Sequence, residues 1–156
     1  MGFFKSLFGN ATATVSAISG EAKAAISQLQ RKDDVHALLA IVALVAGADG
    51  EVEESERKAI VDYVTMGDVF KGFTREQLAS TLDTNFKKCV SAMLKEDLYD
   101  AIAGIADEPD TAKVVMRAGI AVASADGEFE PQEREVLLEV CSRLGLNASD
   151  FRQLKS

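Results

Sequence analysis

An acidic segment of ten residues occurs twice in this chain, and this repeat constrains the fold more than any other feature of the sequence. Residues 48–57 read ADGEVEESER and residues 125–134 read ADGEFEPQER, so seven of the ten positions are identical when residue 48 is aligned with residue 125. The apolar pattern keeps the same offset beyond the segment, as in the pair Ile60 and Leu137. The sequence therefore predicts a duplicated unit of helix, acidic turn and helix, because self-similarity at a fixed offset indicates a repeated structural unit.

Hydrophobic periodicity in the rest of the chain is also helical. Apolar residues recur three and four positions apart, and no alternating run of strand length is present. We predict an all-α fold of about seven helices in a single domain, as the length of 156 residues suggests. An N-terminal amphipathic segment and helix would occupy residues 1–32, and a helical domain residues 33–154, with repeat units at about 33–67 and 110–145.

Pro131 predicts where the helix after the second acidic turn begins. Proline is favoured at the first helical position, which makes Glu130 the N-cap and Glu133 the third helical residue. The repeat transfers the same frame to Glu53 and Glu56 in the first unit.

Other helix starts are predicted from capping residues. Thr74 opens a helix with capping-box spacing, and Asn147 opens a short last helix. We expect Asp33 and Asp110, which the repeat aligns with each other, to cap the first helix of each unit, with Pro109 ending the helix before Asp110.

The charge of the chain is acidic and unevenly distributed. A formal net charge of −8 counts against nucleic-acid binding, because contact with phosphates needs a basic surface. Nine of the 25 acidic residues lie within residues 49–56 and 126–133. The two turns are therefore the candidate site.

Two cysteines, Cys89 and Cys141, are too few for a disulfide framework and lack metal-type spacing, which is typical of a reduced cytoplasmic compartment. We expect both to be small core residues; the alternative is a thiol with redox chemistry. The longest apolar run, residues 37–48, is shorter than the roughly 20 residues that span a bilayer. Residues 1–9 carry four large apolar side chains in a mildly basic segment, and either contact a membrane peripherally or form an arm.

The acidic turns resemble the second half of a calcium-binding EF-hand loop, with an acid, the glycine of a sharp turn and a glutamate at the last position. The first half is missing, because Val45 and Gly47, and Val122 and Ser124, occupy its first side-chain ligand positions. The turns are therefore not EF-hands.

Two interpretations of the acidic residues remain open. An all-oxygen site without histidine or cysteine suits calcium or magnesium. Alternatively, acidic residues gather at a helix N-terminus because they cap its free N–H groups and complement its dipole. The candidate metal ligands are Asp49, Glu51, Glu53, Glu56, Asp126, Glu128, Glu130 and Glu133. Neither turn offers a nucleophile with a base, so we predict that the protein is not an enzyme.

The two Ala-Asp-Gly-Glu segments, each between an apolar helix and a Glu-Arg helix start, resemble those of the TerB family of tellurite-resistance proteins over about residues 33–154. The resemblance implies an all-helical, internally duplicated bacterial domain with a metal-binding acidic surface. It also implies partners among other tellurium-resistance proteins, including a TerC-type integral membrane protein, at the inner membrane surface.

Two alternatives to this function are a tellurite-processing protein that uses a thiol, and a protein-interaction scaffold without metal. The first depends on Cys89 or Cys141, and the second leaves the acidic residues as caps and partner contacts.

Overall fold

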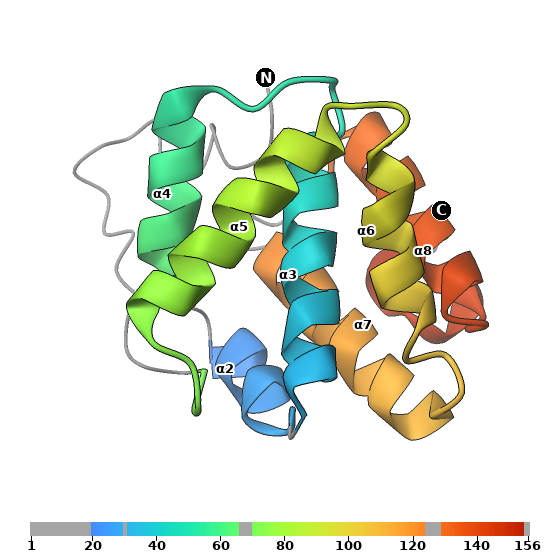
Figure 1. Ribbon diagram of the computed structural model, residues 1–156. Helices are drawn as coiled ribbons and strands as arrows, with labels where there is room; N and C mark the ends of the chain where they lie inside the picture. Colours follow the sequence, from blue (N-terminus) through green and yellow to red (C-terminus); the bar gives the residue numbers. More distant parts are fainter. Residues whose placement is uncertain (1–19, 30, 66–69, 124–128, 155–156) are drawn as a thin grey trace.

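The computed structural model describes residues 20–29, 31–65, 70–123 and 129–154, and these residues contain helices and no β-strand (Figure 1). The predicted all-α class is therefore confirmed. The described helices are α2 (Gly20–Ser27), α3 (Lys32–Ala46), α4 (Glu54–Thr65), α5 (Arg75–Cys89), α6 (Lys95–Ala103), α7 (Pro109–Ala123), α8 (Pro131–Arg143) and the 3-10 helices η2 (Ala148–Asp150) and η3 (Arg152–Leu154).

Helix α3 is the centre of the core. Residues 37–46 of α3 are all buried, and α3 contacts α5, α6, α7 and α8. In Figure 1, α4 and α5 lie on one side of α3, α6 and α8 on the other, and α7 crosses behind it. A helix that is apolar on every face needs such a position, because each face must find an apolar neighbour.

Gly119 of α7 lies where α7 crosses α3. A Cβ atom at this position would lie 2.9 Å from Cγ2 of Ile41, which is fully buried. The absence of a side chain at Gly119 therefore allows the two helices to pack closely.

Corresponding helices of the two predicted units have corresponding bounds. Helix α7 begins and ends at the positions that the repeat aligns with the two ends of α3, and α8 begins at Pro131, which aligns with Glu54 at the start of α4. Their neighbours differ, however, because α4 packs on α5, whereas α8 packs on α3, α6, α7 and the two 3-10 helices. Equivalent sequence positions thus have different surroundings.

The predicted N-caps Asp33 and Asp110 are wrong. Helix α3 begins at Lys32 and α7 at Pro109, so both aspartates lie inside the first turn. Pro109 was expected to end the preceding helix, but it is the first residue of α7, where its missing N–H has no consequence and its fixed φ suits a helix. The aspartates complement the helix dipole instead of capping it.

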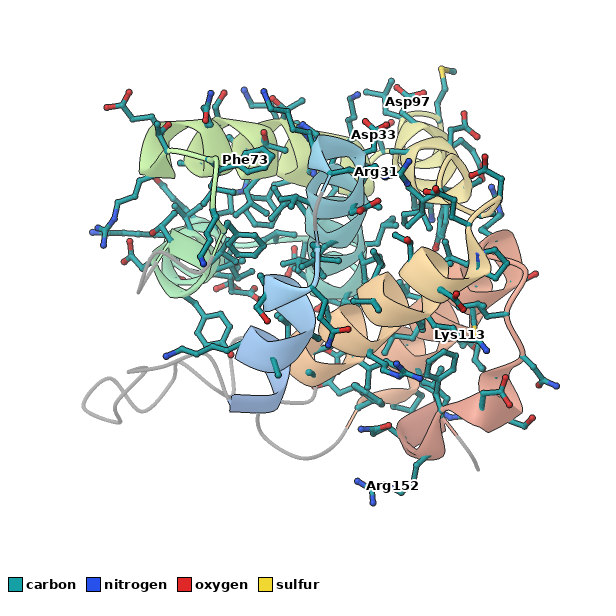
Figure 2. The ribbon with its side chains drawn as sticks, turned by 90° about the horizontal axis from the view of Figure 1, so that it is seen from below. Arg31, Asp33, Phe73, Asp97, Lys113 and Arg152 are labelled. Carbon is teal, nitrogen blue, oxygen red and sulfur yellow. The ribbon has the colours of Figure 1, made fainter. Side chains whose placement is uncertain are left out.

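The start of α3 is held by Asp34, one position further along the chain. Its carboxylate accepts the Arg31 backbone N–H at 3.3 Å and pairs with the Arg31 guanidinium at 3.2 Å. The same guanidinium pairs with Glu108, directly before α7, and Figure 2 shows Arg31 beside Asp33 at this end of α3. Arg31 therefore connects the N-terminal ends of α3 and α7.

Two other predicted helix starts are confirmed in position. Thr74 and Gln77 exchange hydrogen bonds of 2.9 and 3.0 Å, which completes the capping box of α5. Asn147 caps the last segment by accepting the Ser149 N–H at 3.0 Å. This segment forms the two 3-10 helices rather than the single helix that we predicted.

Candidate functional site

The first acidic turn connects α3 to α4 and is shaped largely by its own backbone. The N–H of Gly47 donates to the Ala43 carbonyl at 2.9 Å, and the N–H of Gly50 donates to the Gly47 carbonyl at 2.9 Å. Gly50 has a φ of 99°. This backbone conformation favours glycine, because the Cβ atom of any other residue would clash with that residue's own backbone. Asp49 accepts the Glu51 N–H at 3.3 Å, and both side chains are exposed.

The last glutamate of each motif folds back onto the helix start. Glu133 is 2% exposed and accepts the Glu130 backbone N–H at 2.8 Å. Glu56 is 5% exposed and accepts the Glu53 N–H at 3.3 Å. The frame predicted from Pro131 and the repeat is therefore confirmed, with each glutamate at the third helical position. These two carboxylates satisfy N–H groups that a helix leaves without an intrahelical partner.

The other predicted metal ligands have different positions. Asp49, Glu51 and Glu53 are exposed in the first turn, and Glu130 is half-buried beside Glu133. Asp126 and Glu128 lie outside the described residues. Within the described ranges, no three Asp, Glu, His or Cys side chains are close enough together to hold a metal ion. Among the residues that the structure places, the donor set does not converge, and the eight-residue site remains a prediction.

The arginine that ends each motif was not a predicted site residue, although it occupies the same place in both copies. Arg134 is half-buried, and its Nη2 donates to the Leu154 carbonyl in η3. Arg57 is also half-buried, but its Nε is covered and has no hydrogen-bond acceptor among the described residues. The repeat indicates that Arg57 and Arg134 are equivalent positions, but the sequence does not show which part of the chain covers each arginine.

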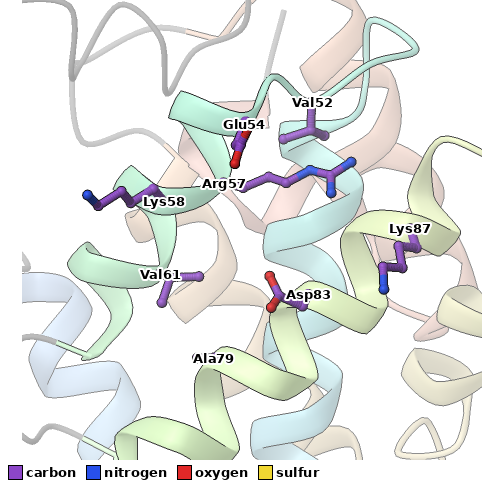
Figure 3. A pocket seen from close by; sticks show the side chains of 8 residues that line it. All are labelled: Val52, Glu54, Arg57, Lys58, Val61, Ala79, Asp83 and Lys87. Carbon is purple, nitrogen blue, oxygen red and sulfur yellow. The ribbon is translucent and has the colours of Figure 1, made fainter.

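Arg57 lines a groove of about 680 Å³ between α4 and α5, and its side chain extends from α4 into the groove (Figure 3). Three basic and two acidic side chains surround an apolar wall, and none of these five charged groups forms an ion pair within the described part of the chain. The lining residues are Val52, Glu54, Arg57, Lys58, Val61, Ala79, Asp83 and Lys87.

The two cysteines are buried, as expected. Burial raises the pKa of Cys89 to about 11, although the positive charge of Arg57 acts in the opposite direction. Its Sγ contacts the Phe86 carbonyl at 3.3 Å. Burial also raises the pKa of Cys141, which is 1% exposed. The raised pKa keeps the Cys89 thiol protonated at neutral pH, so the reactive thiolate is scarce.

None of the described helices is long and apolar enough to cross a membrane. Residues 1–9, for which we left open a peripheral membrane contact or an N-terminal arm, lie outside the described residues.

Comparisons with known proteins give a family. The chain matches the family described as "Tellurite resistance protein TerB" over residues 35–156. It is 28% identical over 131 residues to the co-chaperone protein DjlA of Aliivibrio fischeri (strain ATCC 700601 / ES114), a match that covers 81% of this chain and 44% of the relative. The chain thus spans less than half the length of this relative, and no solved structure matches it. Because the family match covers most of its length, the chain belongs to the TerB family of tellurite-resistance proteins.

Proposed function

We propose that this protein serves tellurite resistance by binding other proteins rather than by transforming a substrate. The observation that carries this proposal is the role of the motif glutamates. Glu56 and Glu133 are buried and hold helix starts, so the most recognisable feature of the sequence builds the fold. Partner-binding surfaces then lie elsewhere on the helices. A relative that is itself named a co-chaperone supports a binding role.

The expected partners are proteins of a membrane-bound tellurium-resistance complex, with a TerC-type integral membrane protein among them. This part of the proposal depends on family membership. We infer that the chain docks from the cytoplasmic side as a peripheral component.

Cation binding at the acidic turns is the second part of the proposal. In the first turn Asp49 and Glu51 are exposed, and their oxygens are of the type that calcium or magnesium prefers. Glu56 is not available in the same way, because its carboxylate holds the start of α4. We therefore expect weak binding in which water completes the coordination shell. A calcium or magnesium titration that follows the Gly50 amide signal by NMR tests this part, and a shift that Asp49→Asn does not change would contradict it.

The thiol alternative has less support. Both cysteines are buried, and burial raises the pKa of each thiol, whereas nucleophilic cysteines have lowered values and access to solvent.

Complementation tests the proposed function. A strain from which this gene is deleted would express the wild-type chain, the variant Cys89→Ala with Cys141→Ala, or no protein, and growth on tellurite would be measured. We expect the wild-type chain and the cysteine variant to restore growth equally. Restoration by wild type alone, with the variant folded and present at equal level, would favour thiol chemistry. No restoration by either would contradict a role in tellurite resistance.

A further inference from the structure

The groove between α4 and α5 has the chemistry of a docking surface. We propose that it binds an acidic, amphipathic helical segment of a protein partner, with a partner carboxylate on Arg57. This inference rests on the proposed function, because it names the surface and the partner chemistry for a protein that acts by binding.

Arg57 supplies the first argument. Its Nε is covered and has no acceptor among the described residues, although buried donors are nearly always hydrogen-bonded. The whole residue is only partly buried and lines the groove, so the outer part of its guanidinium can be reached from there, unlike the covered Nε. A carboxylate is the acceptor that matches a guanidinium best, because its two oxygens fit two parallel N–H donors.

Arg134 shows what this motif position does when a chain segment covers it. Its guanidinium donates to the Leu154 carbonyl in η3, which packs on α8. Arg57 occupies the same place in the first motif but faces the groove. A segment from a partner would cover Arg57 in the way that η3 covers Arg134.

The charges of the groove complement an acidic segment with separated carboxylates. Arg57, Lys58 and Lys87 give three positive charges, against two negative charges on Glu54 and Asp83. The lining of the groove therefore carries a net charge of +1 (three positive less two negative groups), on a chain with a formal net charge of −8. The two acidic side chains would repel a continuous polyanion, which favours a peptide whose carboxylates are spaced.

Exposed apolar side chains lie just beyond the C-terminal end of α5, the helix that forms one wall of the groove. Ala79, Asp83 and Lys87 are four residues apart and share one helical face of α5, and Val90 follows as the residue directly after this helix. Val90 is 41% exposed, and Met93 and Leu94 beyond it are 83% and 43% exposed. These three are the exposed large hydrophobic residues of the described part of the chain. An amphipathic segment could therefore place carboxylates on the groove and apolar side chains on this patch.

A labelled synthetic peptide tests the proposal with the full-length chain. The probe is a fluorescein-labelled helix of about four turns with glutamates along one face and leucines beside them; the matched control peptide carries glutamine in place of each glutamate. Fluorescence anisotropy measures affinity, and NMR of isotope-labelled protein locates the site. We expect saturable binding at micromolar to millimolar concentration, at least tenfold weaker binding of the glutamine peptide, and amide shifts at Ala79, Asp83 and Val90.

Variants assign the binding to the groove. We expect Arg57→Gln to weaken binding of the glutamate peptide at least tenfold, whereas Arg75→Gln, an exposed change on α5 that does not line the groove, changes it less than twofold. If Arg57→Gln perturbs folding, Lys87→Glu on the exposed surface provides the same test.

Several outcomes would overturn the proposal. These are no saturable binding, equal affinity for the glutamine peptide, or shifts confined to a face outside the groove. Binding to phosphatidylglycerol vesicles that Lys87→Glu abolishes, without peptide binding, would assign the surface to a membrane instead. A peptide-binding-deficient Arg57→Gln that still restores growth on tellurite would refute a role for the groove and leave the proposed function intact.

Discussion

Replacement of Glu133 separates the two interpretations of the acidic motif. As a capping residue, Glu133 needs an oxygen that accepts the Glu130 N–H, and glutamine supplies one equally well. As a metal ligand, Glu133 needs its charge, which glutamine lacks. We therefore predict that Glu133→Ala destabilises the protein clearly and Glu133→Gln only slightly, both in the absence of metal.

The magnitude follows from the contacts of Glu133. Alanine would leave the Glu130 N–H without its acceptor, and loss of a cap costs about 1 kcal/mol. Loss of the negative charge at the helix start costs a further ~0.3–1 kcal/mol, and this is the larger part of what glutamine loses. Because Glu133 is 2% exposed, water cannot readily replace the carboxylate, so we expect a total of about 2 kcal/mol for alanine and below about 1 kcal/mol for glutamine. For a chain of this length, about 2 kcal/mol lowers Tm by roughly 4–8 °C.

The assay is urea unfolding followed by circular dichroism, with EDTA present throughout, and Glu135→Ala, an exposed change on the same helix, as the control. Equal destabilisation by Glu133→Ala and Glu133→Gln would refute the capping argument, since it would make the charge the important property. Unchanged stability of both variants in EDTA, with loss of stabilisation by calcium, would establish the ligand interpretation instead.

Three further predictions concern the core and the surface. Gly119→Ala places a methyl group 2.9 Å from Cγ2 of Ile41, so we expect the free energy of unfolding, measured with denaturant, to fall by about 1–3 kcal/mol. The loss caused by Gly119→Ala should be smaller in a chain that also carries Ile41→Ala, and additive effects of the two changes would refute the clash. Burial raises the pKa of Cys89 to about 11, so the thiol of the unfolded chain loses its proton first as the pH rises. Between about pH 9 and pH 11, the free energy of unfolding of the wild type should therefore fall by roughly 2–3 kcal/mol relative to that of Cys89→Ala. Parallel curves of unfolding free energy against pH for the two proteins would contradict this. Arg143 pairs with Glu96 at 3.2 Å and lies 4.7 Å from the centre of the Tyr99 ring. Arg143→Gln should therefore lower the free energy of unfolding by ~1 kcal/mol at low salt and by less at high salt, and a loss that salt does not change would refute an electrostatic origin.

Helix starts show both the reach and the limit of sequence reasoning. Pro131 gave the correct frame for α8, and the repeat carried it to α4, where no proline marks the start. The same rule applied to Pro109 would have placed the start of α7 correctly, but Asp110 offered a competing cap. Local signals for a helix start can conflict, and the side chain that holds the first turn decides between them.

The site was predictable only as a segment of sequence. Spacing indicated that Glu53 and Glu56, like Glu130 and Glu133, share a helix start, and the structure confirms this arrangement. The burial of Glu56 was not predictable, because it depends on how α4 packs in the folded chain and not on the spacing of residues in the motif. The sequence alone therefore could not decide which carboxylates remain available to a cation.

The contrast between Arg57 and Arg134 indicates where function has to be sought in this fold. The two arginines end nearly identical motifs, yet one bonds to the chain's own backbone and the other lines a groove. Because the motif is shared, it cannot explain a difference between the two units; the neighbours of α4 and α8 can. Loss of Arg134 should therefore act mainly on stability by releasing η3, whereas loss of Arg57 should act mainly on partner binding. If both replacements lowered stability equally and left binding unchanged, the two arginines would be structural residues, and the groove would have no role in recognition.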